Sequence, residues 1–348
     1  MSDISKLDKN FAVNTTLPDE GLRFYDVDEA PFKVYGVYKD DGKYRRMPES
    51  VAKEVSNIVG ILHAKTAGGR VRFKTNSKSV AIHAKIDRPD KMPHMPFTGS
   101  IGFDIYVGNS YYKTFVPKID VTTEWDSIVY FETDEMRDIT INFPLYCYVC
   151  ELYVGLDEDA EVLEGTPYRN KKPIVYYGSS ITQGACASRP GTCYQNIIAR
   201  RFNYDYINLG FSGSCLAEDV MVDYIKGLDM SVFVCDYDHN APDPEYLEAT
   251  HEKMFKAIRA AHPELPVIFM SRPRYRLIES DRRRLEIIKK TYNNALEAGD
   301  KNVYLVDNEQ LTALCGGEGL VDATHPSDLG FVSMAKAVGD VIEKIKID

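Results

Sequence analysis

The stretch that decides the fold covers residues 174–184 and reads IVYYGSSITQG. Its first four residues are apolar or aromatic and lie between Pro173 and Gly178, which predicts a short buried strand. Ser179 and Ser180 follow where this strand gives way to a turn and a helix. Side chains at the carboxyl end of a strand in an open α/β sheet reach the crevice where ligands bind, so a serine here can be a nucleophile. A serine-rich turn that only caps a helix is an equally good interpretation of these residues alone.

Strand-like and helix-like segments alternate from this stretch to the end of the chain. Apolar runs of strand length recur at 206–209, 232–235, 267–270 and 303–306. Periodic patterns typical of helices cover about 192–202, 244–261, 281–298 and 329–347. This alternation predicts an α/β fold with a parallel sheet, right-handed crossovers and helices on both faces of the sheet.

Residues 1 to about 165 are β-rich instead. Residues 71–75 and 79–86 alternate apolar with polar side chains, as half-buried strands do, and residues 76–78 supply a turn between them. Further short strands are predicted at 101–107, 111–116, 127–131, 139–143 and 147–154, and a helix at 48–59. Short strands at this spacing are typical of a β-sandwich or a jelly roll.

Two domains are expected from this change of pattern, and a length of 348 residues agrees with that number. Residues 155–172, rich in Asp, Glu and Gly, break the strand pattern. We therefore predict an N-terminal β-sandwich domain over residues 1–165 and an α/β domain over residues 166–348. The N-terminal domain can recognise a carbohydrate polymer, cover the active site or mediate assembly into a homo-oligomer.

Composition and charge limit the class of protein. The net charge of -10 disfavours nucleic acid and anionic membranes as partners, because phosphate groups are bound by clustered Lys and Arg. The basic cluster at 282–284 lies in a helical pattern and is interpreted as a solvated face. Residues 1–9 contain no apolar core of signal-peptide length, and no later run approaches a membrane span. We therefore expect a cytoplasmic protein.

Seven cysteines with scattered spacing indicate reduced thiols, since an odd number cannot pair completely within one chain. Cys147 and Cys150 form a C-x-x-C pattern inside a predicted strand. Positions three apart on a strand face opposite sides of the sheet, so we interpret these two as packing thiols and not as a metal or redox pair.

Serine hydrolysis needs a nucleophile, a base, a carboxylate that orients the base, and donors for the oxyanion. Besides Ser180, the C-terminal half offers Gly213, where a backbone N–H can approach an oxyanion, and Asn240, whose amide is a second donor. Asp322 precedes His325 by three residues in a loop before the last helix. That spacing can put carboxylate and imidazole on one side of a turn, so that Asp322 holds His325 in the tautomer that accepts the serine proton.

The run from Gly178 to Gly184 resembles the first block of the SGNH (GDSL-type) hydrolases. Gly213, Asn240 and the Asp322–His325 pair match later blocks of that family in the same order, and the resemblance covers residues 173–348. Residues 102–106, GFDIY, are similar to the Gly-x-Asp-Leu-Tyr segment of a β-rich domain that precedes some GDSL-like lipase/acylhydrolase members. The resemblance implies a flavodoxin-like three-layer hydrolase domain whose mechanism requires no metal or other cofactor.

Matched by position, the resemblance implies Ser180 as nucleophile, His325 as base and Asp322 as the residue that orients the base. It also implies an oxyanion hole formed by the N–H groups of Ser180 and Gly213 together with Asn240.

The sequence departs from the family pattern in two blocks. The first block more often reads Gly-Asp-Ser, whereas here Ser179 takes the middle position and is a second candidate nucleophile. The third block more often reads Gly-x-Asn-Asp, whereas here His239 precedes Asn240 and an Ala-Pro pair follows it. The departure in the third block predicts an altered oxyanion or acyl pocket.

Two further polar residues, His239 and Arg272, allow more than one interpretation. His239, with Asp236 and Asp238, has the composition of a metal site, but we favour a hydrogen-bonded residue that lines the substrate pocket. Arg272 follows the fourth strand of the predicted sheet. It can bind a substrate anion or pair with nearby carboxylates, and the sequence does not decide between these.

The predicted function is hydrolysis of short acyl esters, most readily acetyl esters, on a carbohydrate such as an oligosaccharide. The 23 tyrosines and the polar chain suit a sugar ligand, because aromatic faces pack against sugar rings. Acyl transfer or lipase-type acylhydrolysis would use the same three residues. A non-catalytic carbohydrate-binding protein is the alternative from a different class.

Overall fold

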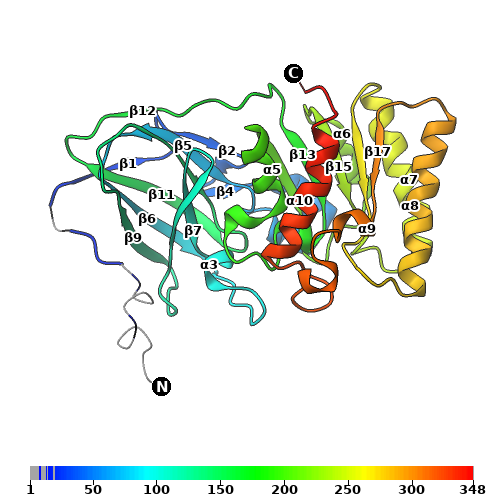
Figure 1. The fold of residues 1–348 in the computed structure, drawn as a ribbon, viewed down its shortest axis with the longest axis horizontal. Coiled ribbons are helices and arrows are strands. Elements are labelled where there is room, and N and C mark those ends of the chain that lie inside the picture. Colours follow the sequence, from blue (N-terminus) through cyan, green and yellow to red (C-terminus); the bar gives the residue numbers. More distant parts are fainter. Residues whose placement is uncertain (1–7, 9–12, 14, 19, 348) are drawn as a thin grey trace.

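The computed structural model describes residues 8, 13, 15–18 and 20–347. Antiparallel strands gather at one end of the molecule, and alternating strands and helices form the other end (Figure 1). The fold is therefore mixed α/β, as predicted. Residues 1–7 and 9, on which the expectation about a leader depends, lie outside the described residues. Along the described part of the chain, no helix is both long enough and apolar enough to cross a bilayer.

The N-terminal part contains two antiparallel sheets. The first has the order β1 (Leu22–Asp26), β11 (Tyr148–Asp157), β6 (Ser79–Asp87) and β9 (Glu124–Tyr130). The second has the order β12 (Val162–Glu164), β5 (Arg70–Thr75), β10 (Arg137–Asn142), β7 (Phe103–Val107) and β8 (Ser110–Phe115), with β2 (Lys33–Tyr35) also paired to β5. A small hairpin of β3 (Tyr38–Asp40) and β4 (Lys43–Arg45) and the short helix α3 (Phe97–Ser100) complete this part.

One hydrophobic core joins these two sheets. Ile82 and Leu152 of the first sheet and Phe73 and Ile141 of the second are all fully buried in it. The turn at 76–78 consequently carries the chain from one sheet to the other, and β5 and β6 do not form a hairpin with each other. β5 pairs with β10, whereas β6 pairs with β11 and β9. These partners are distant in sequence, so the local alternation predicts the strands but not their pairing.

The helix predicted at 48–59 is two helices, α1 (Glu49–Val55) and α2 (Asn57–Leu62). Ser56 separates them with an extended backbone, and its hydroxyl accepts a hydrogen bond from the N–H of Val59. A serine in this geometry begins a new helix more readily than it continues one.

A five-stranded parallel sheet forms the centre of the α/β part. Its order is β14 (Tyr206–Gly210), β13 (Ile174–Gly178), β15 (Val232–Asp236), β16 (Val267–Met270) and β17 (Val303–Val306). Each neighbouring pair is parallel. Numbered along the chain this order is 2-1-3-4-5, as in flavodoxin-like sheets, where ligands bind at the switch point beside the first strand.

Helices cover both faces of this sheet. Along β13, Ile174 and Tyr176 belong to one core and Val175 and Tyr177 to the other, as expected where a strand is buried on both sides. The first core includes α5 (Tyr194–Phe202) and α10 (Asp328–Ile342), and the second includes α6 (Asp219–Lys226), α7 (Pro244–Ala261) and α8 (Glu279–Glu297).

Sequence reasoning missed α6, because its eight residues are too few to show a clear helical period of apolar side chains. The remaining short helices are α4 (Ser180–Gln183) and α9 (Asn308–Leu311), with 3-10 turns at Pro190–Thr192 and Gly316–Gly319.

Arginines of the N-terminal part cover the free edge of the parallel sheet. β14 is an edge strand, so its outward carbonyl groups lack a strand partner. Arg70 Nη2 donates to the carbonyl of Tyr206 at 3.2 Å, and Arg46 Nη1 donates to those of Asn208 and Gly210 at 3.0 and 2.6 Å. These acceptors alternate along β14, as outward-facing carbonyls do. The N-terminal part thus takes the place of a neighbouring strand.

The positive charges of Arg70 and Arg46 are balanced in different ways. Arg70 forms an ion pair with Asp205 and lies 4.0 Å from the centre of the Tyr206 ring. Arg46 has no carboxylate partner among the described residues; it donates to the carbonyl of Leu62 at 2.7 Å and lies 4.7 Å from the centre of the Phe211 ring. Burial lowers the pKa of Arg46 to about 9. This buried cation therefore depends on backbone acceptors.

We predict that Arg46→Met lowers the free energy of unfolding by about 3 kcal/mol, because it leaves buried carbonyl groups of Leu62 and β14 without donors. Urea unfolding followed by far-UV circular dichroism measures this change. Arg23→Met removes an exposed arginine from β1 and should change the free energy by less than about 0.5 kcal/mol. Equal stability of the two variants would contradict this account of the sheet edge.

Candidate active site

The turn after β13 presents Ser180 at the carboxyl end of the parallel sheet. Ser179 is fully buried, and its hydroxyl accepts a hydrogen bond from the N–H of Ile181 at 3.2 Å, which caps α4. A Cβ atom on Gly178 would lie 2.1 Å from Thr182 Oγ1 and 2.6 Å from the carbonyl oxygen of Asp236. Only glycine therefore fits at this point, and the chain turns sharply enough to leave the side chain of Ser180 partly exposed.

Ser180, His325 and Asp322 form a continuous chain of hydrogen bonds. The Ser180 Oγ and His325 Nε2 atoms are 2.8 Å apart, and His325 Nδ1 is 2.7 Å from Asp322 Oδ2. Asp322 Oδ1 also accepts from the backbone N–H of His325 at 2.7 Å and of Thr324 at 3.1 Å. The structure thus brings together the three residues that the sequence singles out.

The carboxylate of Asp322 is held in its charged form. Partial burial raises the pKa of Asp322, but the hydrogen bonds from the backbone and ring of His325 outweigh burial and lower the pKa to about 2. A charged carboxylate next to Nδ1 keeps the proton on that nitrogen and leaves the lone pair of Nε2 directed at Ser180.

Gly213 and Asn240 line the same pocket as Ser180 and His325. Gly213 has a φ of +68°, which favours glycine, and a Cβ added there would have no atom within 4 Å. The backbone angle, and not crowding, therefore requires this glycine. Asn240 Oδ1 accepts from the N–H of Cys215 at 3.2 Å, so its NH₂ group is left to face the pocket as a donor.

The pocket has a volume of about 560 Å³, and the N-terminal part supplies much of its wall. These residues lie in α2, in the loops that follow α2 and β6, and before β11: Leu62, Lys65, Asp90, Met92, His94 and Tyr146. Lys65 forms an ion pair with Asp90, and the Tyr146 hydroxyl is 2.6 Å from Ser212 Oγ. Sequence reasoning assigned no role to these residues, because they carry no motif and become neighbours only through packing.

The GFDIY segment, residues 102–106, holds the loop that follows Ser180 and α4 through hydrogen bonds. Asp104 is fully buried and accepts hydrogen bonds from the N–H of Gly191 at 2.7 Å, from Arg189 at 3.0 Å and from Asn142 at 2.8 Å. Arg189 also donates to the hydroxyl of Tyr106. The acidic and aromatic residues of this segment therefore attach β7 to the residues between α4 and α5.

His239 and Arg272 have different surroundings. His239 lines the pocket, and its Nε2 is shielded from solvent without a hydrogen-bond partner among the described residues. Burial, reinforced by the nearby Arg272 charge, lowers the pKa of His239 well below its usual value, so the ring is neutral. Arg272 is not a lining residue; it is paired with Asp238 and Asp281. Of its two interpretations, pairing with carboxylates is the one that the structure displays.

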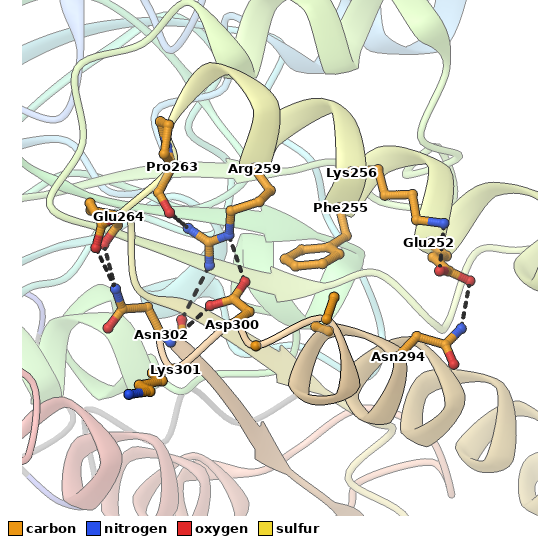
Figure 2. A pocket seen from close by; sticks show the side chains of 13 residues that line it. Glu252, Phe255, Lys256, Arg259, Pro263, Glu264, Asn294, Asp300, Lys301 and Asn302 are labelled. Atoms are coloured by element: carbon orange, nitrogen blue, oxygen red, sulfur yellow. Dashed lines mark hydrogen bonds and ion pairs between the residues drawn. The ribbon is translucent and has the colours of Figure 1, made fainter.

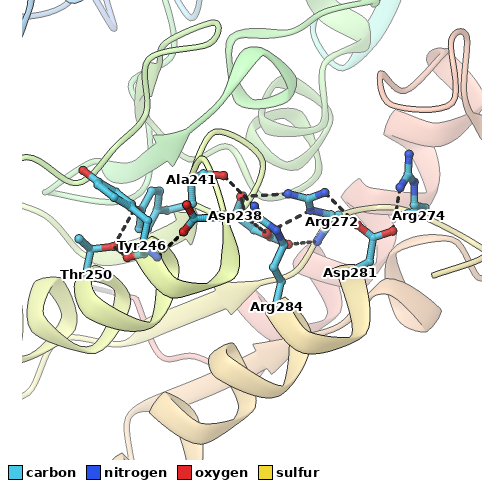
Figure 3. A network of polar contacts seen from close by, with 10 residues as sticks. Asp238, Ala241, Tyr246, Thr250, Arg272, Arg274, Asp281 and Arg284 are labelled. Carbon is cyan, nitrogen blue, oxygen red and sulfur yellow. Dashed lines mark hydrogen bonds and ion pairs between the residues drawn. The ribbon is translucent and has the colours of Figure 1, made fainter. Parts of the chain in front are cut away.

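A network of ion pairs around the buried carboxylate of Asp281 ties the loop with Asn240 and the loop with Asp322 to the start of α8 (Figure 3). Asp281, whose side chain is fully buried, accepts from Arg272 at 2.9 Å and Arg274 at 2.7 Å. Arg272 also contacts Asp238, two residues before Asn240, at 3.1 Å. Arg274 donates to the carbonyl of Ala323, next to Asp322, at 3.3 Å. The carboxylate of Asp281 thus orients the loop that carries Asn240 and the loop that carries Asp322 and His325.

Asp236, Asp238 and His239 do not come together as a metal site. Asp238 faces arginines, whereas Asp236 accepts hydrogen bonds from the hydroxyl groups of Thr182 and Tyr194.

A second pocket, of about 460 Å³, lies at the amino ends of the parallel strands, opposite the end that carries Ser180 (Figure 2). Its lining comes from the C-terminal ends of α7 and α8 and from the residues just before β16 and β17. Arg259 and Asp300 form an ion pair inside it at 2.7 Å. The amino ends of parallel strands are not where such folds place their chemistry, so the pocket with Ser180 is the candidate active site.

Comparison with known proteins agrees with this arrangement. Residues 171–343 match the GDSL-like lipase/acylhydrolase family, and residues 22–162 match the family described as the N-terminus of SGNH hydrolase-type esterases. The chain belongs to the GDSL-like lipase/acylhydrolase family and carries the N-terminal part found in SGNH-type esterases. It is therefore an enzyme of the ester hydrolase class. No curated protein gives a significant match.

Solved structures share the fold over nearly the whole chain. A protein assigned as a GDSL-like lipase from Bacteroides ovatus is 26% identical, with a TM-score of 0.83, covering 94% of this chain and 99% of its own. The salicylyl-acyltransferase SsfX3 from a tetracycline biosynthetic pathway is 20% identical, with a TM-score of 0.76 and coverage of 94% and 98%. The acetyl xylan esterase Est2A from the rumen bacterium Butyrivibrio proteoclasticus is 13% identical, with a TM-score of 0.61 and coverage of 93% and 98%.

We predict that Asp281→Asn lowers kcat by about 10-fold to 100-fold with a small change in KM, because the loops that carry Asn240 and Asp322 lose their common anchor. The free energy of unfolding should also fall by about 3 kcal/mol, since two half-buried arginines lose the fully buried carboxylate that they share. Glu279→Gln, in the same helix but exposed, is the matched control and should leave both quantities unchanged. A stable, fully active Asp281→Asn enzyme would show that the network does not position the loops.

Proposed function

We propose that this enzyme hydrolyses short acyl esters, acetyl esters above all, on a carbohydrate. The observation that carries the proposal is the hydrogen-bonded chain from Ser180 through His325 to Asp322, with Ser180 and His325 lining an open pocket. Ser180 is the nucleophile, His325 the general base and acid, and Asp322 the residue that orients His325. Ser179 is not the nucleophile, because its hydroxyl caps α4 and is buried.

Hydrolysis proceeds in two steps. Ser180 Oγ attacks the acyl carbon while His325 Nε2 takes the hydroxyl proton, and the bond to the alcohol oxygen breaks as His325 returns that proton to the leaving alcohol. Water then attacks the acyl-serine, again giving a proton to His325. The free acid leaves and the Ser180 hydroxyl is restored. Asp322 stays charged throughout and stabilises the imidazolium form of His325.

The developing oxyanion is bound by the N–H groups of Ser180 and Gly213 and by the Asn240 amide. Asn240 is oriented for this task, since the N–H of Cys215 holds its oxygen. His239, whose neutral ring lines the pocket, contacts the acyl or alcohol part of the substrate.

The substrate class follows from the character of the pocket wall. Lys65, Asp90, His94 and Ser212 offer donors and acceptors to a polyol, and the apolar side chains of Leu62, Met92 and Ala185 in the same wall suit a short acyl group. The fold itself hosts both carbohydrate esterases and an acyltransferase, so it does not choose between them. We favour water as acceptor because the pocket is open to solvent beside His325. Product analysis with competing alcohols separates hydrolysis from transfer.

The N-terminal part, proposed as a jelly-roll-like sandwich domain over residues 1–165, serves as one wall of this pocket. The α/β domain over residues 166–348 supplies the reacting groups. The N-terminal domain therefore recognises the alcohol portion of the ester and also covers β14. Removing it would alter the pocket and the sheet edge together, so point variants test the chemistry more cleanly than truncation does.

Ser180→Ala should lower the release of p-nitrophenol from p-nitrophenyl acetate to the rate without enzyme, because within the described part of the chain no other hydroxyl is bonded to His325 Nε2. Ser179→Ala is the matched control. It loses a helix cap worth about 1 kcal/mol but should keep most of the activity. Activity that survives in Ser180→Ala and disappears in Ser179→Ala would overturn the assignment of the nucleophile.

Asn240→Ala should lower kcat by on the order of 100-fold, the usual cost of one oxyanion donor, while KM changes little. Asn302→Ala is the control for general effects of removing an amide, because Asn302 lies just before β17, at the amino ends of the parallel strands. A panel of acetylated mono- and oligosaccharides, with the released acid identified, tests the substrate class. Faster turnover of long-chain acyl esters than of acetylated sugars would reject that part of the proposal.

A further inference from the structure

Three side chains with metal-binding atoms meet beside the proposed base. A ring nitrogen of His94, the Cys186 thiol sulfur and a ring nitrogen of His325 all lie within 4.8 Å of one another. The ring centres of His94 and His325 are 5.7 Å apart. They come from three separate segments, namely the β6–α3 loop, the loop after α4 and the loop before α10. Ester hydrolysis by Ser180 gives Cys186 no role, so the cluster calls for its own explanation.

Two of these groups are available to a ligand. Within the part of the chain that the structure describes, neither the His94 ring nor the Cys186 thiol takes part in a hydrogen bond. His94 is exposed and lies on a loop, whereas Cys186 is buried. The cluster therefore has one side open to solvent and one side shielded from it, as an accessible ion site requires.

His325 already has the surroundings of a metal ligand. Its Nδ1 is bonded to Asp322, and histidines that bind metals almost always donate their second ring N–H to a carboxylate or carbonyl. Its Nε2 is bonded to the hydroxyl of Ser180, a neutral group that a cation displaces more easily than it displaces a carboxylate. The arrangement that makes Nε2 a good proton acceptor also makes it a good electron-pair donor to a metal.

We propose that His94, Cys186 and His325 form a binding site for a borderline-soft divalent cation, Zn²⁺ in the first place, and that its occupancy switches the enzyme off. Two imidazoles and one thiolate are ligands that zinc prefers, with a fourth position left for water or for Ser180 Oγ. Zinc bonds of about 2.1 Å to nitrogen and 2.3 Å to sulfur place ligand atoms roughly 3.5 Å apart, so the exposed His94 loop has to move inward by about 1 Å. The thiol proton of Cys186 leaves to solvent on binding.

Inhibition follows from the proposed role of His325, on which this inference rests. A metal on Nε2 occupies the lone pair that must accept the Ser180 proton, so a chain with bound metal cannot start the acylation step. Hard cations such as Mg²⁺ prefer oxygen ligands and should neither bind here nor inhibit.

Binding can be measured without catalysis in the Ser180→Ala enzyme, titrated with ZnCl₂ in a calorimeter. We expect one ion per chain, and a loss of affinity of about 100-fold when His94→Ala or Cys186→Ala is added. The Co²⁺ form of Ser180→Ala should show a thiolate-to-metal absorption band that Cys186→Ala removes. His83→Ala and Cys315→Ser, both remote from the pocket, are the matched controls and should bind as tightly as their parent.

Inhibition is then measured on p-nitrophenyl acetate, with each variant compared with its own rate in the presence of a chelator. Zn²⁺ should inhibit the parent reversibly and should inhibit His94→Ala and Cys186→Ala only at about 100-fold higher concentration. Equal sensitivity of the parent and both variants, or no binding to Ser180→Ala, would overturn the proposed site. Binding at these three residues without inhibition would support the site and reject His325 as the base, which separates a failure of this inference from a failure of the proposed function.

Discussion

The hydrogen bond between Ser180 Oγ and His325 Nε2 joins residues 145 positions apart, and the rest of the structure fixes its two ends. At one end, Gly178 and the Ser179 cap set the direction of Ser180. At the other, Asp322 and the backbone around it set the ring orientation of His325. A hydrogen bond of this length can serve as a proton path only when both of its ends are held, so the Ser180–His325 pair depends on the scaffold as much as on its own chemistry.

The scaffold holds the site from two directions. From the α/β part, the buried carboxylate of Asp281 connects through Arg272 and Arg274 to the loops that carry Asn240 and Asp322. From the β-rich part, Asp104 holds the loop after α4, while Arg46 and Arg70 close the free edge of β14. The N-terminal part thereby does the work that a further strand would do for an isolated α/β fold, and its helix α2 and loops supply a pocket wall as well.

Much of this architecture could be predicted from the sequence, because periodicity is a local property. The runs of β16, β17 and α7 are found with the bounds that the structure has, since each begins and ends at a clear change of pattern. Ser180, Gly213 and Asn240 were singled out because they follow strand ends, which converge in a parallel sheet, and Asp322 and His325 because of their spacing of three residues. The resemblance to the SGNH hydrolases assigned a role to each of them. The partners of β5 and β6, the carbonyl acceptors of Arg46, and the wall formed by Lys65, Asp90 and His94 were not predicted. They depend on pairings between distant segments, which no local pattern encodes.

The central claim is that Ser180, activated by His325, is the nucleophile of an ester hydrolase. Labelling the folded enzyme with a fluorophosphonate, followed by peptide mass spectrometry, tests it most directly, because the probe reacts with an activated serine and not with a capping hydroxyl. The account predicts a single adduct on Ser180 that disappears when His325→Ala is introduced. An adduct on Ser179, or the absence of any adduct from the folded enzyme, would contradict it.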